Sequence, residues 1–206
     1  MARTSHMHPS FWDRAYRNGT ARWDLRSPSP VLAGLLDSAL LIPGNVLVMG
    51  CGRGYDAVLF AEYGFSVTAL DFSTEALRDA RLLASERAVT IEFADTDIFT
   101  LPPSYDGSFQ YVVEYVTYCA IDPAMRRAYA DVVARVLAPG GCFVGLFFPV
   151  EAREGGPPFA VDRDEVLRLF GGRLRLLSSR IPSESVRQRL GREWLTLWTP
   201  HDGKGK

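Results

Sequence analysis

The residues best suited to chemistry are three glycines and an aspartate within the stretch "VLVMGCGRGYDAVLFAEYGFSVTALDFS" (46–73). Gly50, Gly52 and Gly54 stand between two apolar runs, and Asp71 closes the second run. Glycine lets the backbone turn tightly and lets a ligand approach without a Cβ in the way. A carboxylate at the end of the second run can accept hydrogen bonds from both hydroxyls of a ribose. Together these residues predict a nucleoside site.

The spacing of the glycines narrows the choice of ligand. The dinucleotide fingerprint G-x-G-x-x-G holds pyrophosphate on its loop and helix N-terminus. Here the third glycine comes one position early, Tyr55 stands where close helix–strand packing needs glycine, and no G-x-x-x-x-G-K-[ST] phosphate loop is present. A nicotinamide enzyme is therefore disfavoured. Asp71 and Phe72, which can cover one face of an adenine, still predict an adenosine that carries something other than phosphate. The plain alternatives are a tight turn and a helix-entry acid.

Apolar runs alternate with helical patterns along most of the chain and predict the elements that position these residues. Helical patterns follow the glycines and cover 73–88 and 122–141, so a mostly parallel sheet with helices on both faces is expected. In such a sheet, ligands bind beyond the carboxyl ends of the strands. The runs 173–181 and 193–200 have no convincing helix between them and predict an antiparallel hairpin at the edge. The other predicted strands are 45–50, 66–71, 89–95, 109–116 and 142–149.

The composition describes one globular domain over residues 1–206, with 47% hydrophobic residues and a formal net charge of -1; the tail 201–206 is expected to be disordered. A net charge near zero gives no indication of the basic surface that would bind nucleic acid or an acidic membrane. No run approaches the roughly 18 apolar residues of a membrane span. The three cysteines form neither a CxxC pair nor an even framework, which predicts reduced thiols and a cytoplasmic protein. All three histidines lie near the termini, so no metal site is expected.

Several blocks of the chain resemble class I S-adenosylmethionine-dependent methyltransferases of the thiopurine S-methyltransferase superfamily. The glycine stretch, with Asp56 completing G-C-G-x-G-x-D, is similar to the first motif of the halide/thiol methyltransferase branch. The resemblance runs from about Phe11 to Trp198. It implies a Rossmann-like fold with a mostly parallel seven-stranded sheet, S-adenosylmethionine as methyl donor and S-adenosylhomocysteine as product. The other similar blocks are "FWDRAY…ARWDLRSPSPVL", "DIFTLPPSYDGSFQYVVEYVTYCAIDPAMRRAYADVVARVLAPGG", "GGPPFAVDRDEV" and "LGREWLTLW".

The resemblance implies a set of donor-binding residues. Asp97 and the Ile98 backbone would read the amino edge of adenine, with Asp95 as the competing choice. Glu114, at the end of the fourth strand, would receive the amino group of the methionine moiety or orient the acceptor; its plain alternative is a solvent-facing acid. Asp56 would contact the donor or cap backbone amides. The donor-binding residues implied are Trp23, Gly50, Cys51, Gly52, Gly54, Asp56, Asp71, Phe72, Asp97, Ile98 and Glu114.

The residues on the acceptor side match the family pattern less closely than those on the donor side. The family uses its N-terminal segment, here residues 1–27, as a lid whose tryptophans contact donor and acceptor, although plain packing would also bury them. Where the family more often carries aspartate and paired phenylalanines, this chain has Glu114, Thr117 and Tyr118, which leaves the acceptor open. The catalytic residues implied are Trp12, Glu114 and Tyr118, and the substrate-binding residues are Phe11, Trp12, Tyr115, Tyr118 and Phe159.

Three further charged residues are better explained by structural roles than by catalysis or substrate binding. Asp24 is expected to be a cap, and Arg192 and Glu193 are expected to form surface or hairpin pairs.

Methyl transfer from a sulfonium is an in-line displacement, so alignment of nucleophile, methyl carbon and sulfur is the main task of the enzyme. A thiol ionises near pH 8.5 and halides are already charged, so neither needs much help from a base. The absence of internal histidines fits a soft acceptor: a thiol, a thiopurine-like thiolate or a halide. The alternatives are an O- or N-methyltransferase and a non-catalytic binder of the donor or its product. The expected partner is a small molecule, with no nucleic acid or membrane, on a monomer or weak homodimer.

Overall fold

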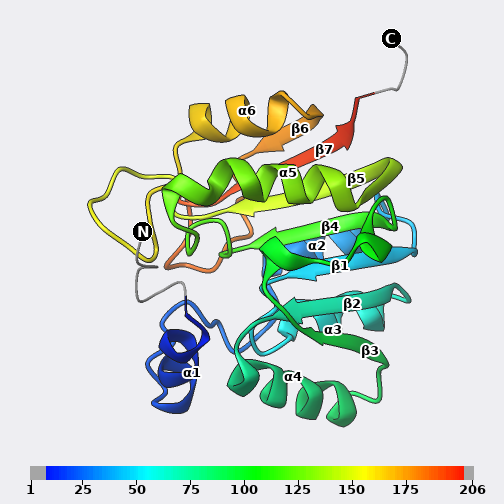
Figure 1. Ribbon diagram of the computed structural model, residues 1–206, viewed down its shortest axis with the longest axis vertical. Helices are drawn as coiled ribbons and strands as arrows, with labels where there is room; N and C mark the ends of the chain where they lie inside the picture. The colour runs from blue at the N-terminus through cyan, green and yellow to red at the C-terminus, as the bar shows by residue number, and fades with distance from the viewer. Residues whose placement is uncertain (1–7, 202–206) are drawn as a thin grey trace. The chain divides into compact units, whose positions relative to one another are not determined.

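The computed structural model describes residues 8–201. Its seven strands form one sheet in the order β3-β2-β1-β4-β5-β7-β6 (Figure 1). The predicted α/β fold, a mostly parallel sheet with an antiparallel C-terminal hairpin, is confirmed. The chain divides into two compact units, Met1–Thr100 and Leu101–Lys206. The expected single domain over 1–206 stays a prediction, and the expected disordered tail (201–206) lies outside the described residues except for His201.

The first unit carries the glycine loop between its first two strands. The strands β1, β2 and β3 pair in parallel, and the register places Asp71 opposite Asp95 at their carboxyl ends. The helix α4 begins where the Ser73 hydroxyl accepts a hydrogen bond from the Ala76 amide, which caps its first turn. The elements are α1 (Pro9–Arg17), α2 (Pro30–Asp37), β1 (Asn45–Met49), α3 (Tyr55–Glu62), β2 (Ser66–Asp71), α4 (Thr74–Glu86), β3 (Ile91–Asp95) and the short 3-10 helix η2 (Ile98–Thr100).

The second unit holds the remaining strands. The strand β4 runs parallel to β5, while β7 is antiparallel to both β5 and β6. The expected helix over 122–141 is shorter, because the chain leaves helical geometry at Leu137 and the strand begins there. The elements are η3 (Pro103–Tyr105), β4 (Phe109–Tyr115), η4 (Pro123–Met125), α5 (Arg126–Val136), β5 (Leu137–Phe147), α6 (Arg163–Gly171), β6 (Leu174–Arg180) and β7 (Trp194–Pro200).

No helix range was predicted for α1, α2 or α6. All three are short; proline at the first position of α1 and of α2 and the Asp162 cap of α6 explain where they begin. Across the described part of the chain, no helix is long and apolar enough to cross a membrane.

Candidate functional site

The glycine loop joins β1 to α3 and is shaped by left-handed backbone. Gly52 has φ +53 and Gly54 has φ +79, and each lies against a close neighbour. A Cβ at residue 52 would come within 2.8 Å of the Tyr16 hydroxyl, and one at residue 54 within 2.9 Å of the Ala80 Cβ. Both positions therefore require glycine, for backbone conformation and for space. The Cys51 amide donates to the Leu70 carbonyl, so the loop is tied to β2.

Gly54→Ala is expected to destabilise the protein by about 2–3 kcal/mol, since the positive φ costs about 1 kcal/mol and the contact with Ala80 adds an overpacking cost. Gly140 is the matched control, because its φ is +74 and nothing lies within 4 Å of the place that a Cβ would take there. Gly140→Ala should cost only about 1 kcal/mol, the backbone term alone. Urea unfolding measures both free energies of unfolding. Equal losses would show that close packing on α4 contributes nothing.

Asp71 lies at the carboxyl end of β2 and braces the loop. Its carboxylate accepts hydrogen bonds from the Gly52 amide at 2.9 Å and the Ser73 amide at 2.9 Å. Only 9% of the residue is exposed, and burial raises the pKa of its carboxyl group. A carboxylate has roughly four lone-pair sites, so Asp71 keeps capacity for further donors such as ribose hydroxyls.

A row of aromatic side chains from the N-terminal segment lies over this loop. The Trp23 indole N–H donates to the Tyr16 hydroxyl at 3.0 Å, and the two rings meet edge to face. Trp12 packs edge to face on Trp23 with ring centroids 5.0 Å apart, and Phe11 packs on Trp12 at 5.1 Å. Burial, and next the Asp71 carboxylate, raise the pKa of Tyr16, so its hydroxyl stays neutral. The predicted aromatic residues of the segment are thus brought together, with Tyr16 added.

The remaining donor-side residues of the first unit occupy loops and helix starts. Asp97 accepts a hydrogen bond from the Phe99 amide at 2.9 Å and begins η2, which contains Ile98, whereas Asp95 is exposed. Asp56 stands in the first turn of α3 and accepts from the Ser29 amide at 2.7 Å, outside the glycine loop. Phe72 is half-buried beside Asp71.

These donor-side residues fit an adenosine ligand. The loop carries no side chain at residues 52 and 54, and beside it stand a buried carboxylate with spare acceptor capacity and the half-buried ring of Phe72. The chemistry matches a ribose and an adenine better than a phosphate, since no described residue provides a glycine-lysine phosphate loop. No group of three or more His, Cys, Asp or Glu side chains among residues 8–201 could hold a metal ion.

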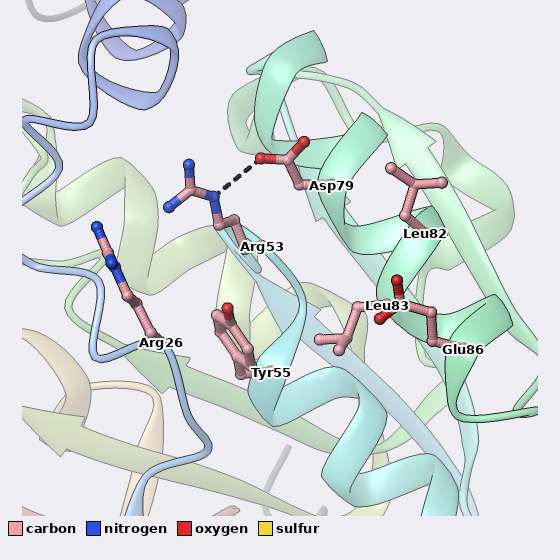
Figure 2. Close-up of a pocket in the computed structure, with 7 residues that line it drawn as sticks. All are labelled: Arg26, Arg53, Tyr55, Asp79, Leu82, Leu83 and Glu86. Atoms are coloured by element: carbon pink, nitrogen blue, oxygen red, sulfur yellow. Dashed lines mark hydrogen bonds and ion pairs between the residues drawn. The ribbon is translucent and has the colours of Figure 1, made fainter.

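A separate pocket opens on the first unit (Figure 2). It contains none of the residues predicted to bind the donor. Its lining residues are Arg26, Arg53, Tyr55, Asp79, Leu82, Leu83 and Glu86.

In the second unit, Glu114 is fully buried, so the solvent-facing alternative is wrong. Both of its carboxylate oxygens lie 3.0 Å from the Tyr118 amide, and one accepts from the Tyr129 hydroxyl at 3.0 Å. Burial raises its pKa to about 7. The carboxylate thereby holds the turn that follows β4, in which Val116 has φ +57, a strained conformation for a β-branched residue.

Tyr118 lies inside an aromatic core rather than on an open wall. Tyr118 is 0% exposed, and its hydroxyl lies 3.3 Å from the Glu165 carboxylate. The Arg126 guanidinium lies 4.5 Å from the centroid of the Tyr118 ring. Direct contact with an acceptor stays a prediction, and it would require this turn to move. The Phe159 amide donates to the Cys119 carbonyl at 2.7 Å, which ties the later loop to the same turn.

Tyr115, the last residue of β4, joins a buried polar cluster that the sequence did not suggest. Its hydroxyl donates to Glu193 at 2.6 Å and accepts from Arg189. Glu193 is 1% exposed and pairs with Arg189 at 3.7 Å in the connection between β6 and β7, so for this residue the hairpin pair is found and the surface pair is wrong. Arg192 pairs with Glu151 as a surface residue would. The charged residues of "RLGREW" (189–194) are typical of a solvent-exposed segment, and only the tertiary structure shows that Glu193 is buried.

Comparison with known proteins now decides the family. The sequence profile described as thiopurine S-methyltransferase matches residues 7–194. The chain belongs to the thiopurine S-methyltransferase family. It is accordingly a methyltransferase that depends on S-adenosylmethionine, and both predictions are confirmed.

Individual relatives of this methyltransferase agree with that assignment. It is 35% identical over 156 residues to a probable thiol methyltransferase 2 of Arabidopsis thaliana, covering 75% of this chain and 68% of that protein. It is 33% identical over 192 residues to thiocyanate methyltransferase 1 of Brassica oleracea, covering 91% and 83%. The fold is shared with Burkholderia thailandensis 1,6-didemethyltoxoflavin-N1-methyltransferase, solved with S-adenosylhomocysteine, at a TM-score of 0.73 and 20% identity over 98% and 92% of the chains.

Several residues around the glycine loop of this methyltransferase were not predicted from the sequence. Tyr16, Arg53 and Asp79 all contact the donor-side residues or each other, and Asp24 binds Arg53 and the Arg26 amide instead of capping a helix. An alternation of acids and arginines around "WDL" and "GRG" was the available signal. It could not be interpreted, because the partners lie far apart in the chain.

Proposed function

We propose that this enzyme transfers the methyl group of S-adenosylmethionine to a small, soft nucleophile: a thiol, a thiopurine-like thiolate, or an anion such as a halide or thiocyanate. The observation that carries the proposal is the donor-side loop with Asp71, joined to relatives named for thiols and thiocyanate. The proposal also takes the enzyme to be cytoplasmic, monomeric or weakly dimeric, and without nucleic-acid or membrane partners. Three free cysteines support the location.

In this proposal the donor lies on the glycine loop. Asp71 accepts from the ribose hydroxyls, Phe72 covers the adenine, and Asp97 with the Ile98 backbone recognises the adenine edge. Gly50, Gly52, Gly54 and the Cys51 backbone shape the surface under the methionine moiety, and Trp23 covers it. Asp56 acts indirectly by holding Ser29. When bound, the donor supplies a methyl group activated by a sulfonium.

The chain's own residues then position the acceptor and exclude water. Trp12 and Phe11 belong to the aromatic row, Tyr115 ends β4, and Tyr118 and Phe159 belong to the turn and loop that follow it. Glu114 acts through that turn, because its oxygens are engaged with Tyr118 and Tyr129. No internal histidine serves as a base, which suits an acceptor that is already anionic at neutral pH.

The test is an acceptor screen that measures S-adenosylhomocysteine formation at saturating donor. Thiocyanate, iodide and an aromatic thiol are expected to give kcat/KM values at least about 100-fold above those of a phenol, an aromatic amine or a carboxylate. The phenol needs a base to ionise it, whereas the amine and the carboxylate are less polarisable nucleophiles than sulfur or iodide. Turnover confined to phenols, amines or carboxylates would establish the O- or N-methyltransferase alternative. Thermal stabilisation by S-adenosylhomocysteine without turnover on any acceptor would establish the binding-protein alternative.

A further inference from the structure

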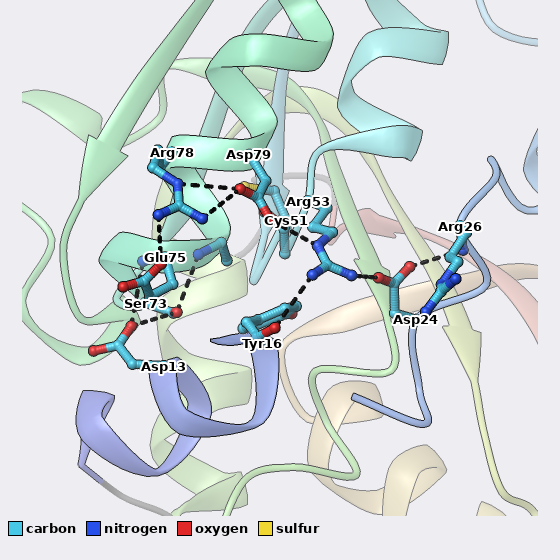
Figure 3. Close-up of polar contacts among 12 residues, drawn as sticks. Asp13, Tyr16, Asp24, Arg26, Cys51, Arg53, Ser73, Glu75, Arg78 and Asp79 are labelled. Carbon is cyan, nitrogen blue, oxygen red and sulfur yellow. Dashed lines mark hydrogen bonds and ion pairs between the residues drawn. The ribbon is translucent and has the colours of Figure 1, made fainter. Parts of the chain in front are cut away.

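The lid segment, defined here as residues 8–27, is tied to the glycine loop through one arginine (Figure 3). Arg53 stands between Gly52 and Gly54 in the loop. Its Nη1 pairs with Asp24 Oδ2 at 2.6 Å, and its Nη2 donates to the Tyr16 carbonyl at 3.3 Å. Both partners belong to the lid segment, so one side chain holds it at two places.

The same guanidinium is anchored on its other side by α4. Its Nε pairs with Asp79 Oδ2 at 2.9 Å, and its Cζ lies 5.4 Å from the centroid of the Tyr16 ring. Arginine can make these contacts together because its donors form a planar fork. The result is a bridge from helix α4, through the donor loop, to the lid.

Burial makes this bridge stronger than a surface ion pair. The Arg53 side chain is 20% exposed and that of Asp24 is 7% exposed. Exposed pairs contribute little, but removing one partner of a buried pair leaves an uncompensated charge. Loss of Arg53 would therefore favour movement of Asp24 out to solvent.

The other contacts of the lid segment hold a different part of it. Asp13 accepts from the Ser73 hydroxyl at 2.7 Å, and Arg17 pairs with Glu75 at 3.0 Å, so both fasten α1 to the start of α4. Figure 1 shows α1 beside α4. The stretch after α1 is held by the Trp23 indole, which donates to the Tyr16 hydroxyl, and by Arg53, which pairs with Asp24.

We propose that Arg53 is a positioning residue that holds Trp23, on which Trp12 packs, over the donor loop before the donor binds. By doing so, it slows the release of donor and product. The part concerning release rests on the proposed function, whereas lid closure in the free protein does not.

Acrylamide quenching of tryptophan fluorescence in the ligand-free protein tests closure directly. The sequence has four tryptophans, and Trp194 and Trp198 are 5% and 1% exposed, so the quenching reports Trp12 and Trp23. Arg53→Met is expected to raise the quenching constant at least about twofold as the lid segment opens locally. Arg78→Met is the matched control, because Arg78 also pairs with Asp79 but contacts no lid residue in any described ion pair. It should behave as wild type.

Stopped-flow release of S-adenosylhomocysteine provides the second readout. Arg53→Met is expected to release it about tenfold faster, since a lid segment that opens more often leaves the bound ligand uncovered for more of the time. Asp24→Asn should do the same and covers the case in which Arg53→Met does not fold. Asparagine keeps an oxygen for the Arg26 amide while removing the charge that Arg53 meets.

Two results separate the inference from the proposed function. Quenching and release that match those of Arg78→Met in both variants would overturn the role of Arg53. Failure of the wild type to bind S-adenosylhomocysteine would contradict the proposed function, and the quenching comparison would still decide whether Arg53 closes the lid segment.

Discussion

Asp71→Ala is expected to raise the dissociation constant for S-adenosylhomocysteine at least about 100-fold. Two hydrogen bonds from ribose hydroxyls to a carboxylate contribute about 1.5–3 kcal/mol each, and their joint loss exceeds the 2.8 kcal/mol or so that corresponds to a factor of 100. The loop also loses its brace at the Gly52 and Ser73 amides. Isothermal titration calorimetry measures the change. Asp95→Ala is the matched control, since Asp95 stands opposite in register at the end of β3 and is exposed.

A ligand lacking the ribose hydroxyls separates direct contact from loop bracing. Wild type should bind S-adenosylhomocysteine far more tightly than its 2′,3′-dideoxy analogue, while Asp71→Ala should bind the two nearly alike. This double cycle isolates the pairwise interaction. Discrimination that survives unchanged in Asp71→Ala would place the ribose on another residue. Urea unfolding of the ligand-free variants reports how much of the effect is loss of loop stability.

The glycine loop was predictable because its signals are local. The apolar runs fixed the strands, and glycine at residues 52 and 54 marked positions where positive φ and close packing coincide. The predicted carboxylate at residue 71 stands at the strand end because the register of parallel strands follows from the hydrophobic pattern. Nothing in the local pattern showed that Tyr16 would lie on Gly52, since that contact joins residues far apart in the sequence.

Charged side chains were harder to interpret for a related reason. A solvent-facing acid was the plain alternative for Glu114, and a surface or hairpin pair was expected for Glu193. Tertiary packing buries both and supplies partners from other elements. In the sequence, Arg53 appears only as the first variable position of the motif G-C-G-x-G-x-D. Its function as a bridge depends on Asp24 and Asp79, which approach it only after the chain folds. Sequence analysis identifies residues that act through their own backbone more readily than residues that act through distant partners.

Glu114→Gln is expected to remove a pH dependence of stability. Burial raises the Glu114 pKa from 4.5 to about 7, against the opposing effect of hydrogen bonds from Tyr118 and Tyr129. Between these values the unfolded chain binds fewer protons at this residue than the folded protein. The free energy of unfolding therefore falls as the pH rises from 4.5 to 7, by about 3 kcal/mol at 1.36 kcal/mol per pKa unit. Above pH 7 the loss is complete, and below pH 4.5 it is absent.

Glutamine preserves the shape and most of the hydrogen bonds of this site. Its oxygen can accept from the Tyr118 amide, and its amide group can donate to the Tyr129 hydroxyl, which both donates and accepts. The stability of Glu114→Gln relative to wild type should thus increase by about 3 kcal/mol between pH 4.5 and pH 7.5, because the variant buries no charge. Urea unfolding at a series of pH values measures it, and the difference between the two proteins cancels the other titrating groups.

The exposed loop residue Glu154 supplies the control, since Glu154→Gln should follow wild type at every pH. Parallel stability curves for wild type and Glu114→Gln would show that Glu114 does not ionise in this range.

Steady-state kinetics of Glu114→Gln then distinguish the two roles considered for Glu114. If Glu114 acts through the turn after β4, the donor KM is unchanged while the acceptor KM responds. If it receives the amino group of the donor, the donor KM rises instead, because a neutral amide replaces the anion that the ammonium group would meet.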